Sequence, residues 1–189
     1  MPLLPAESFV YPPDILSDAA APLEESRVWW VLHTRPRREK ALARRLVEHK
    51  VGFFLPVYKR SWRSPQNRVL HGHLPLFPGY AFLFGDRADR MKAMETRLVA
   101  RCLAVDDQAK LCKELVQVYR LISSGAPLAP EERIKPGALV EIVRGPFAGL
   151  RGKVVRRGKR LKFIVAVDFL QRGASVHIEG AMLTELDRP

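Results

Sequence analysis

Apolar and polar positions between residues 26 and 125 follow patterns that predict alternating strands and helices. Residues 28–33 form a short β-branched and aromatic run typical of a buried strand. From Arg37 onward, Leu42 and Leu46 recur at helical spacing, and basic residues occupy the opposite face. Further strands are predicted at 53–58, 80–84 and 98–105, with helices at 87–96 and from Asp106 or Asp107 to just before Gly125. The order β-α-β-β-α-β-α predicts an α+β fold, a ferredoxin-like α/β sandwich with one helix added.

The pattern changes after residue 134. Five short apolar runs at 138–143, 152–156, 161–167, 174–178 and 181–185 are separated by turns that contain glycine. Short strands at this spacing predict a small SH3-like β-barrel. The strands are rich in valine and isoleucine, which favour β-structure.

Two segments have the composition of tails or linkers. Residues 1–25 contain five prolines, five acidic residues and no Lys or Arg, so we expect a disordered acidic tail. Residues 126–133 hold two prolines and three charges without periodicity, which indicates a linker. The predicted domains are therefore 26–125 and 134–189.

Charge narrows the class of partner. The 189 residues include 32 Lys or Arg against 20 Asp or Glu, giving a net charge of +12 and a pI near 10.2. Since the tail carries −5, the rest of the chain carries +17, and nucleic acid is the first candidate partner. No apolar run is long enough to span a membrane, no signal peptide is evident, and two cysteines exclude a disulfide framework. These features predict a cytoplasmic protein with no membrane partner.

An enzyme finds little support in the residues. His71 and His73 could share a metal, but no acidic residue lies between Glu48 and Asp86 to join them. The stretch 145–153 resembles a phosphate-binding loop only superficially, because Phe147 and Val154 stand where glycine and Ser or Thr are needed. We therefore expect no catalytic residue, metal or cofactor.

Binding features are clearer. Arg35, Arg37 and Arg38 lie where the first strand meets the first helix, and the amides of a helix start add to their attraction for phosphate. A second basic loop or hairpin tip at 60–68 places arginines around Trp62. This tryptophan either stacks on an unpaired base or packs against its own domain, and the sequence leaves both alternatives open.

The first domain also has an excess of aromatic residues. Eight lie on or beside its strands, and strands that alternate faces cannot direct all of them into one small core. They are Trp29, Trp30, Phe53, Phe54, Phe77, Tyr80, Phe82 and Phe84. Either some form an exposed apolar groove for a protein partner, or the sheet is covered on both faces.

Several of these motifs together resemble a known family. WWVLHTRPRRE at 29–39, FLPVY at 54–58 and PLFPGYAFLF at 75–84 are similar to the N-terminal domain of NusG transcription elongation factors. KPGALVEIVRGPFAGLRGKV at 135–154, with Gly145, Gly149 and Gly152, resembles the family's KOW motif. The resemblance covers about 27–187, and its motifs occur in the expected order.

The resemblance implies a function and a set of contact residues. The family's N-terminal domain binds the β′ clamp helices of RNA polymerase through a hydrophobic depression, which suppresses pausing or termination. The segments at 34–38 and 76–80 look most like the specialised, RfaH-like antitermination branch, which also contacts non-template DNA. By resemblance, the polymerase-binding residues are Trp30, Phe54, Phe82 and Phe84, and the DNA-binding residues are His33, Arg35, Arg37 and Arg38, with Arg68, His71 and His73 as weaker candidates.

Other implied contacts are less direct. That branch's second contact, to the polymerase β subunit, has no counterpart at 87–96, where Asp89-Arg-Met-Lys92 stands. The family's KOW domain recruits termination factor Rho or a ribosomal protein, and the protein is expected to be a monomer. A ribosome-associated, KOW-type RNA-binding protein is the alternative function.

Overall fold

The structure is a computed structural model, and it describes residues 9–17, 26–131, 138–157, 160–178 and 183–185. By internal contacts the chain divides into two compact units, one formed by 1–56 and 77–112 and the other by 57–76 and 113–189. This division assigns the 57–76 segment and most of the last helix of the first predicted domain to the second unit. Each unit is described by itself.

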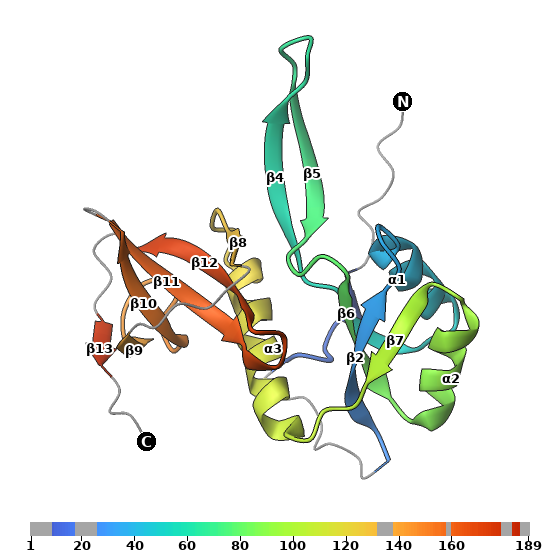
Figure 1. The fold of residues 1–189 in the computed structure, drawn as a ribbon. Helices are drawn as coiled ribbons and strands as arrows, with labels where there is room; N and C mark the ends of the chain where they lie inside the picture. The colour runs from blue at the N-terminus through green and yellow to red at the C-terminus, as the bar shows by residue number, and fades with distance from the viewer. Residues whose placement is uncertain (1–8, 18–25, 132–137, 158–159, 179–182, 186–189) are drawn as a thin grey trace. The chain divides into compact units, whose positions relative to one another are not determined.

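The first unit is built on a five-stranded antiparallel sheet (Figure 1). Its strands are β1 (Val10–Tyr11), β2 (Val28–Thr34), β3 (Gly52–Phe54), β6 (Tyr80–Gly85) and β7 (Val99–Leu103), in the order β1-β3-β6-β2-β7. The two strands joined by the first helix, β2 and β3, are separated by β6, which pairs with both. The predicted alternation of strands and helices is therefore confirmed, and so is an α/β composition.

Two helices lie on one face of this sheet, α1 (Glu39–Glu48) and α2 (Arg87–Glu95), as Figure 1 shows. Helix α1 buries Leu42, Ala43 and Leu46, the apolar positions expected from their spacing. Asp86 is the N-cap residue of helix α2, and its side chain accepts a hydrogen bond of 2.8 Å from the Asp89 backbone amide. Gly85 comes close to this helix, because a Cβ there would lie 2.7 Å from the Asp89 side chain.

The N-terminal region corrects one prediction. A disordered tail was expected over 1–25, yet residues 9–17 are ordered, and β1 pairs with β3 through Val10 opposite Phe54. The Leu55 amide donates a 2.7 Å hydrogen bond to the Phe9 carbonyl, and Leu16 is buried. An unpaired sheet edge supplies hydrogen-bonding groups to any nearby extended segment, so a two-residue strand forms despite the prolines around it. The remaining residues of the predicted tail, 1–8 and 18–25, lie outside the described residues.

The last helix of the first predicted domain, α3 (Gln108–Ser123), begins after Asp107 as expected. The Asp107 side chain accepts a 2.9 Å bond from the Lys110 amide, and Gly125 follows the helix with φ +72°. Gln108 fixes the helix start to β2, accepting from the Trp29 amide at 2.8 Å and donating to the Trp29 carbonyl at 3.0 Å. A single glutamine side chain thus satisfies both backbone groups of a strand residue.

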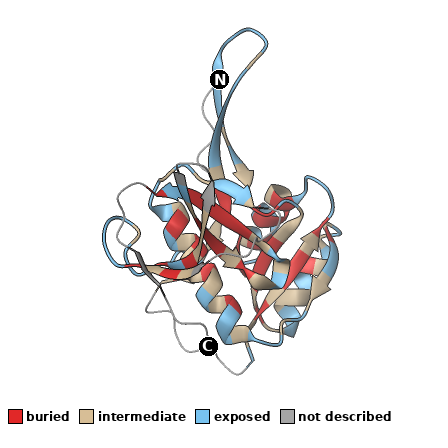
Figure 2. Cartoon of the chain, turned by 60° about the vertical axis from the view of Figure 1, so that its left-hand side comes forward, coloured by how far each residue is buried: buried red, intermediate tan, exposed pale blue. Residues whose placement is uncertain are grey.

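The predicted strand at 53–58 is two strands. After β3 the chain passes Leu55 and Pro56 and enters β4 (Val57–Arg63), which pairs with β5 (Val69–Pro75) as a two-stranded hairpin. Of the two alternatives for the basic 60–68 segment, a hairpin tip is the observed one, with a turn at 64–68. Figure 2 shows that the hairpin is exposed along most of its length.

The second unit contains a six-stranded antiparallel sheet in the order β13-β9-β10-β11-β12-β8. Five of its strands are those predicted: β9 (Ala138–Ile142), β10 (Arg151–Arg157), β11 (Arg160–Val167), β12 (Arg172–Ile178) and β13 (Leu183–Glu185). A short 3-10 turn, η1 (Asp168–Leu170), joins β11 to β12. The buried interior includes Phe163, Ile164, Val165 and Val176.

The predicted linker supplies the sixth strand, which is a second correction. Strand β8 (Ala129–Glu131) pairs with β12, and Glu131 forms an ion pair with Lys162. The Ser175 hydroxyl donates a 2.8 Å hydrogen bond to the Glu131 carboxylate. This polar cluster is nearly enclosed, with Ser175 buried, so the segment is held by more than its backbone pairing. Residues 132–133 of the predicted linker lie outside the described residues.

Among the described residues, no helix is long and apolar enough to cross a membrane.

Candidate nucleic-acid and polymerase interface

The arginines predicted at the strand-to-helix junction lie together at the surface. Arg35, Arg37 and Arg38 are all exposed between β2 and α1. Arg38 is the N-cap residue of α1, and its side chain makes no capping hydrogen bond. The positive end of the helix dipole therefore coincides with three exposed guanidinium groups.

The backbone of the junction is tightly specified. The Arg35 amide donates to the Leu98 carbonyl at 2.8 Å, and the Arg38 amide donates to the Arg35 carbonyl at 3.1 Å. Arg37 has φ +60°, in the left-handed region that residues other than glycine seldom adopt. Strained positions of this kind concentrate at functional sites, because the surrounding structure must hold them.

Glu39 connects the junction to the loop before β6. Its carboxylate is buried and accepts a 2.8 Å hydrogen bond from the Gly79 amide. The Gly79 carbonyl in turn accepts from the Thr34 amide at 2.9 Å. Gly79 has φ +84°, so glycine suits this position, where the loop turns against the end of β2.

The structure adds Arg101, a residue that sequence reasoning missed. His33 lies opposite Tyr80 on β6 and opposite Arg101 on β7, so the three side chains share one face of the sheet. The His33 and Tyr80 rings are 5.1 Å apart between centroids. Arg101 is exposed, and it extends the cationic junction across a third strand. Only the strand register reveals this neighbour, because Arg101 is far from the junction in the sequence.

The weaker DNA-binding candidates Arg68, His71 and His73 lie on the hairpin and are exposed. The His71 Nδ1 atom is 2.7 Å from the Ser61 hydroxyl on the facing strand. The Arg68 amide donates to the Ser64 hydroxyl at 3.2 Å and so helps to close the turn. The hairpin that carries these residues belongs to the second unit.

Three of the four polymerase-binding candidates share one face of the first sheet. Phe54 is opposite Phe82, and Phe84 lies two residues further along β6. Phe54 is 2% and Phe82 0% exposed, with Phe77 packed edge-on against Phe82 at 6.3 Å. Phe84 is half-buried, between Trp29 at 5.1 Å and the Arg27 guanidinium at 5.3 Å. The sequence left open whether these aromatic residues form an exposed groove or are covered. Phe54 and Phe82 are covered, whereas Phe84 is partly exposed.

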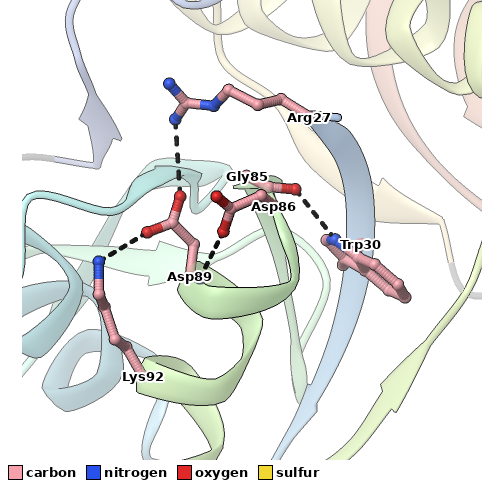
Figure 3. Close-up of polar contacts among 6 residues, drawn as sticks. All are labelled: Arg27, Trp30, Gly85, Asp86, Asp89 and Lys92. Atoms are coloured by element: carbon pink, nitrogen blue, oxygen red, sulfur yellow. Dashed lines mark hydrogen bonds and ion pairs between the residues drawn. The ribbon is translucent and has the colours of Figure 1, made fainter. Parts of the chain in front are cut away.

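Trp30 belongs to the opposite face. Its indole nitrogen donates to the Gly85 carbonyl at 3.2 Å (Figure 3). The Arg90 guanidinium lies 5.1 Å from the ring centroid. Asp89 accepts ion pairs from Lys92 at 2.9 Å and from Arg27 at 3.8 Å. The segment that replaces the expected β-subunit contact is thus engaged within its own unit, and a single depression on one sheet face does not contain all four predicted aromatic residues.

Two groups near α2 have shifted pKa values. A hydrogen bond from the Asp89 amide lowers the pKa of the Asp86 carboxyl, which matches its capping role. Burial raises the pKa of the Cys102 thiol, and Arg90 opposes this only partly. Cys102 therefore stays protonated near neutral pH, which disfavours thiolate chemistry at this position. In the part of the chain that the structure describes, no three His, Cys, Asp or Glu residues gather into a set that could hold a metal ion.

The KOW-motif glycines have structural roles between and within strands. Gly145 and Gly149 lie in the β9–β10 connection with φ +91° and +82°. The Gly149 amide donates to the Ile142 carbonyl at 2.7 Å, which closes the turn. Gly152 is in β10, where a Cβ would lie 2.4 Å from the Ile164 carbonyl oxygen. The motif therefore specifies a turn and a close strand approach, and neither is a chemical site.

Comparison with protein families agrees with these features. Residues 27–134 match the family described as transcription termination factor nusG, and residues 136–158 match the KOW motif. The comparison with curated proteins gives no significant match. The first match covers more than half of the chain and includes the whole arginine junction. This chain therefore belongs to the NusG family of transcription elongation and termination factors.

Proposed function

We propose that this protein is an elongation and antitermination factor that binds the β′ clamp helices of RNA polymerase, contacts the non-template DNA strand and suppresses pausing or termination. The observation that carries the proposal is the rigid junction of Arg35, Arg37 and Arg38 within the family-matched region. Binding that bridges the clamp would favour the closed, elongating state of the polymerase over the paused one. We also propose a ferredoxin-like fold for the first domain, an SH3-like fold for the KOW domain, and a cytoplasmic monomer of the RfaH-like branch.

The DNA contact can be tested with the junction arginines. Arg35→Ala and Arg38→Ala should each weaken binding to a single-stranded oligonucleotide and lower the salt slope by about 0.7 per lost phosphate contact. Arg45→Ala is the matched control, because Arg45 is exposed on α1 but paired with Glu48 at 2.9 Å. An unchanged salt slope in both junction variants would exclude these residues as phosphate contacts. The same binding measurements with alanine variants of Arg68, His71 and His73 test whether these weaker candidates contact DNA.

The polymerase contact needs variants that keep the fold. Phe84→Ala and Trp30→Ala change half-buried aromatics, one on each sheet face, and should reduce co-purification with bacterial RNA polymerase if the corresponding face docks. Phe169→Ala removes an aromatic side chain that is 41% exposed in the second unit, and it should leave binding unchanged. Absence of any association of the wild-type protein with polymerase would contradict the proposed function.

The KOW domain is proposed to recruit Rho or a ribosomal protein. Phe169 and Val143 are exposed apolar residues in this unit, and they are candidates for such a contact. Co-purification of each partner with wild-type protein and with Phe169→Ser separates the two. The alternative of a ribosome-associated RNA-binding protein is less well supported, because the larger family match lies in the first domain.

A further inference from the structure

The β4–β5 hairpin is cationic and contains an exposed apolar surface. Between residues 57 and 75 there are four Lys or Arg residues and no Asp or Glu. Trp62 is 42% exposed, Leu70 42% and Val69 55%. Large apolar side chains on a two-stranded ribbon are costly unless a partner covers them, and the charge of the ribbon favours an anionic partner.

The strand register separates the hairpin into two faces. Residues directly opposite one another share a face, and successive residues alternate. One face therefore carries Tyr58, Arg60, Trp62, Leu70, Gly72 and Leu74, and the other carries Lys59, Ser61, Arg63, Val69, His71 and His73. The first face is largely aromatic and apolar, and the second is largely basic.

Trp62 lies directly over Gly72. A Cβ on Gly72 would lie 2.8 Å from Cη2 and 3.1 Å from Cζ3 of the indole, so any larger residue would displace the ring. The backbone of the facing strand thus covers one side of the indole. Since the side chain is still 42% exposed, its accessible area comes from the opposite side and the edge. Glycine here lets an indole rest on the ribbon with a surface left free for stacking.

The turn that carries this surface is held by side-chain bonds. Arg63 donates to the Asn67 side-chain oxygen at 2.8 Å, and the Asn67 amide donates to the Ser64 carbonyl at 2.9 Å. The Ser61 and His71 side chains are joined across the strands at 2.7 Å. A pre-ordered support lowers the entropy that a ligand must overcome on binding.

We propose that the hairpin binds single-stranded DNA, with an unpaired base stacked on the Trp62 indole and a neighbouring phosphate neutralised by Arg60, which lies on the same face of the hairpin. An exposed aromatic ring flanked by cations is the arrangement that single-strand binding requires, and duplex DNA does not offer the face of its bases to such a ring. A protein partner with an apolar surface would not account for the complete lack of acidic residues on the hairpin. The choice of DNA rests on the proposed function, in which the partner strand is non-template DNA.

The experiment uses the full-length chain and a fluorescein-labelled 12-residue oligodeoxythymidine, followed by anisotropy across a salt series. Trp62→Ala should weaken binding by roughly 5- to 150-fold, the range for loss of one stacked base, with the salt slope unchanged. Trp62→Phe should recover most of the affinity, because a phenyl ring still stacks. Met91→Ala is the matched control, since Met91 is an apolar side chain that is 50% exposed on α2, outside the hairpin, and the substitution should leave affinity unchanged within twofold.

A second readout is the quenching of tryptophan fluorescence by the oligonucleotide. The chain has three tryptophans, and because Trp29 is buried and Trp30 packs under Arg90, quenching should disappear in Trp62→Phe. The proposal is overturned if Trp62→Ala binds within twofold of wild type, if Met91→Ala loses as much affinity as Trp62→Ala, or if the matching duplex or RNA binds tighter than the single-stranded DNA.

These outcomes are distinguishable from failure of the proposed function. If Trp62→Ala binds DNA normally while Arg35→Ala and Arg38→Ala lower the salt slope, the hairpin proposal is overturned and the junction contact stands. If the wild-type protein does not co-purify with polymerase but Trp62→Ala loses single-strand affinity, the hairpin contact is supported and the polymerase role is contradicted.

Discussion

Phe82→Ala is the substitution whose consequence the structure fixes most firmly. Phe82 is 0% exposed on β6, a strand with neighbours on both sides. Its ring packs edge-on against Phe77 at 6.3 Å and is stacked with Phe54 at 6.4 Å. Truncating a buried phenylalanine costs about 3–5 kcal/mol, and aromatic pairs contribute about 0.5–1.5 kcal/mol each beyond their buried area.

Because the surrounding sheet has little freedom to collapse into the space, we expect a loss of about 4 kcal/mol in the free energy of unfolding. This is a large part of the ~5–15 kcal/mol that stabilises a typical domain. Urea denaturation monitored by circular dichroism measures the loss, with Phe84→Ala as the control on the same strand face. The half-buried Phe84 should cost about half as much.

A loss below about 1 kcal/mol in Phe82→Ala, with an unchanged dependence on urea, would refute the assignment of Phe82 to the core. The expected result also has a consequence for function. If Phe82→Ala protein fails to bind polymerase, unfolding is a sufficient explanation. The clamp contact is therefore better tested with the half-buried aromatics.

Single substitutions at four other positions test the junction backbone, the N-terminal segment, the KOW motif and the cap of α2. Arg37→Gly should change the free energy of unfolding by less than about 1 kcal/mol, because the steric strain removed at φ +60° offsets the greater conformational freedom of glycine in the unfolded chain. The same variant should bind single-stranded DNA more weakly in a salt series. Leu16→Ala should speed hydrogen exchange of the Leu55 amide, which bonds to Phe9, since the N-terminal segment can detach locally; unchanged exchange would contradict its anchoring role. Gly152→Ala should lower stability by about 1–3 kcal/mol in thermal unfolding, because the Ile164 carbonyl is backbone and cannot move aside. Asp86→Ala should lower the melting temperature at pH 7. Its difference from wild type should shrink as the pH falls from 3.8 through the lowered pKa of the Asp86 carboxyl, because protonation removes the charge that strengthens the cap, whereas the cap in Asp86→Asn should not change with pH.

Local patterns predicted most of the elements. Leu42 and Leu46 identified the buried face of α1, and Asp107 and Gly125 marked the ends of α3, because these signals involve residues within one or two turns of each other. The five strands of the second sheet were predicted for the same reason, since each carries its own β-branched run between turns. Ordinary periodicity and capping were sufficient for these parts.

The elements that were missed depend on distant partners. Strands β1 and β8 have two and three residues, too few to show a period, and each forms because an existing strand offers an unpaired edge. Their sequences, with prolines and acidic residues, predict tail and linker. The burial of Leu16 and the Glu131–Lys162 pair are fixed by residues far along the chain.

The same reasoning applies to the candidate site. The sequence identified Arg35, Arg37 and Arg38 from their position before a helix, and the structure places them at the surface. Arg101 joins them only through the strand register. The aromatic excess could not be assigned to a groove or a core from composition, because exposure depends on what covers each face. Phe54 and Phe82 proved to be buried.

The acidic residue within the junction explains how its charge stays effective. Between His33 and Val47, Glu39 is the only Asp or Glu in the sequence, and a carboxylate beside three arginines would normally pair with one of them. Its Oε1 atom instead accepts from the Gly79 amide, and the side chain is buried. The acidic group therefore orders the loop before β6, while the guanidinium groups face solvent. The three arginines therefore remain available to an anionic strand. The hydrogen bond from the Gly79 amide both keeps the Glu39 carboxylate away from the guanidinium groups and holds the backbone that carries them.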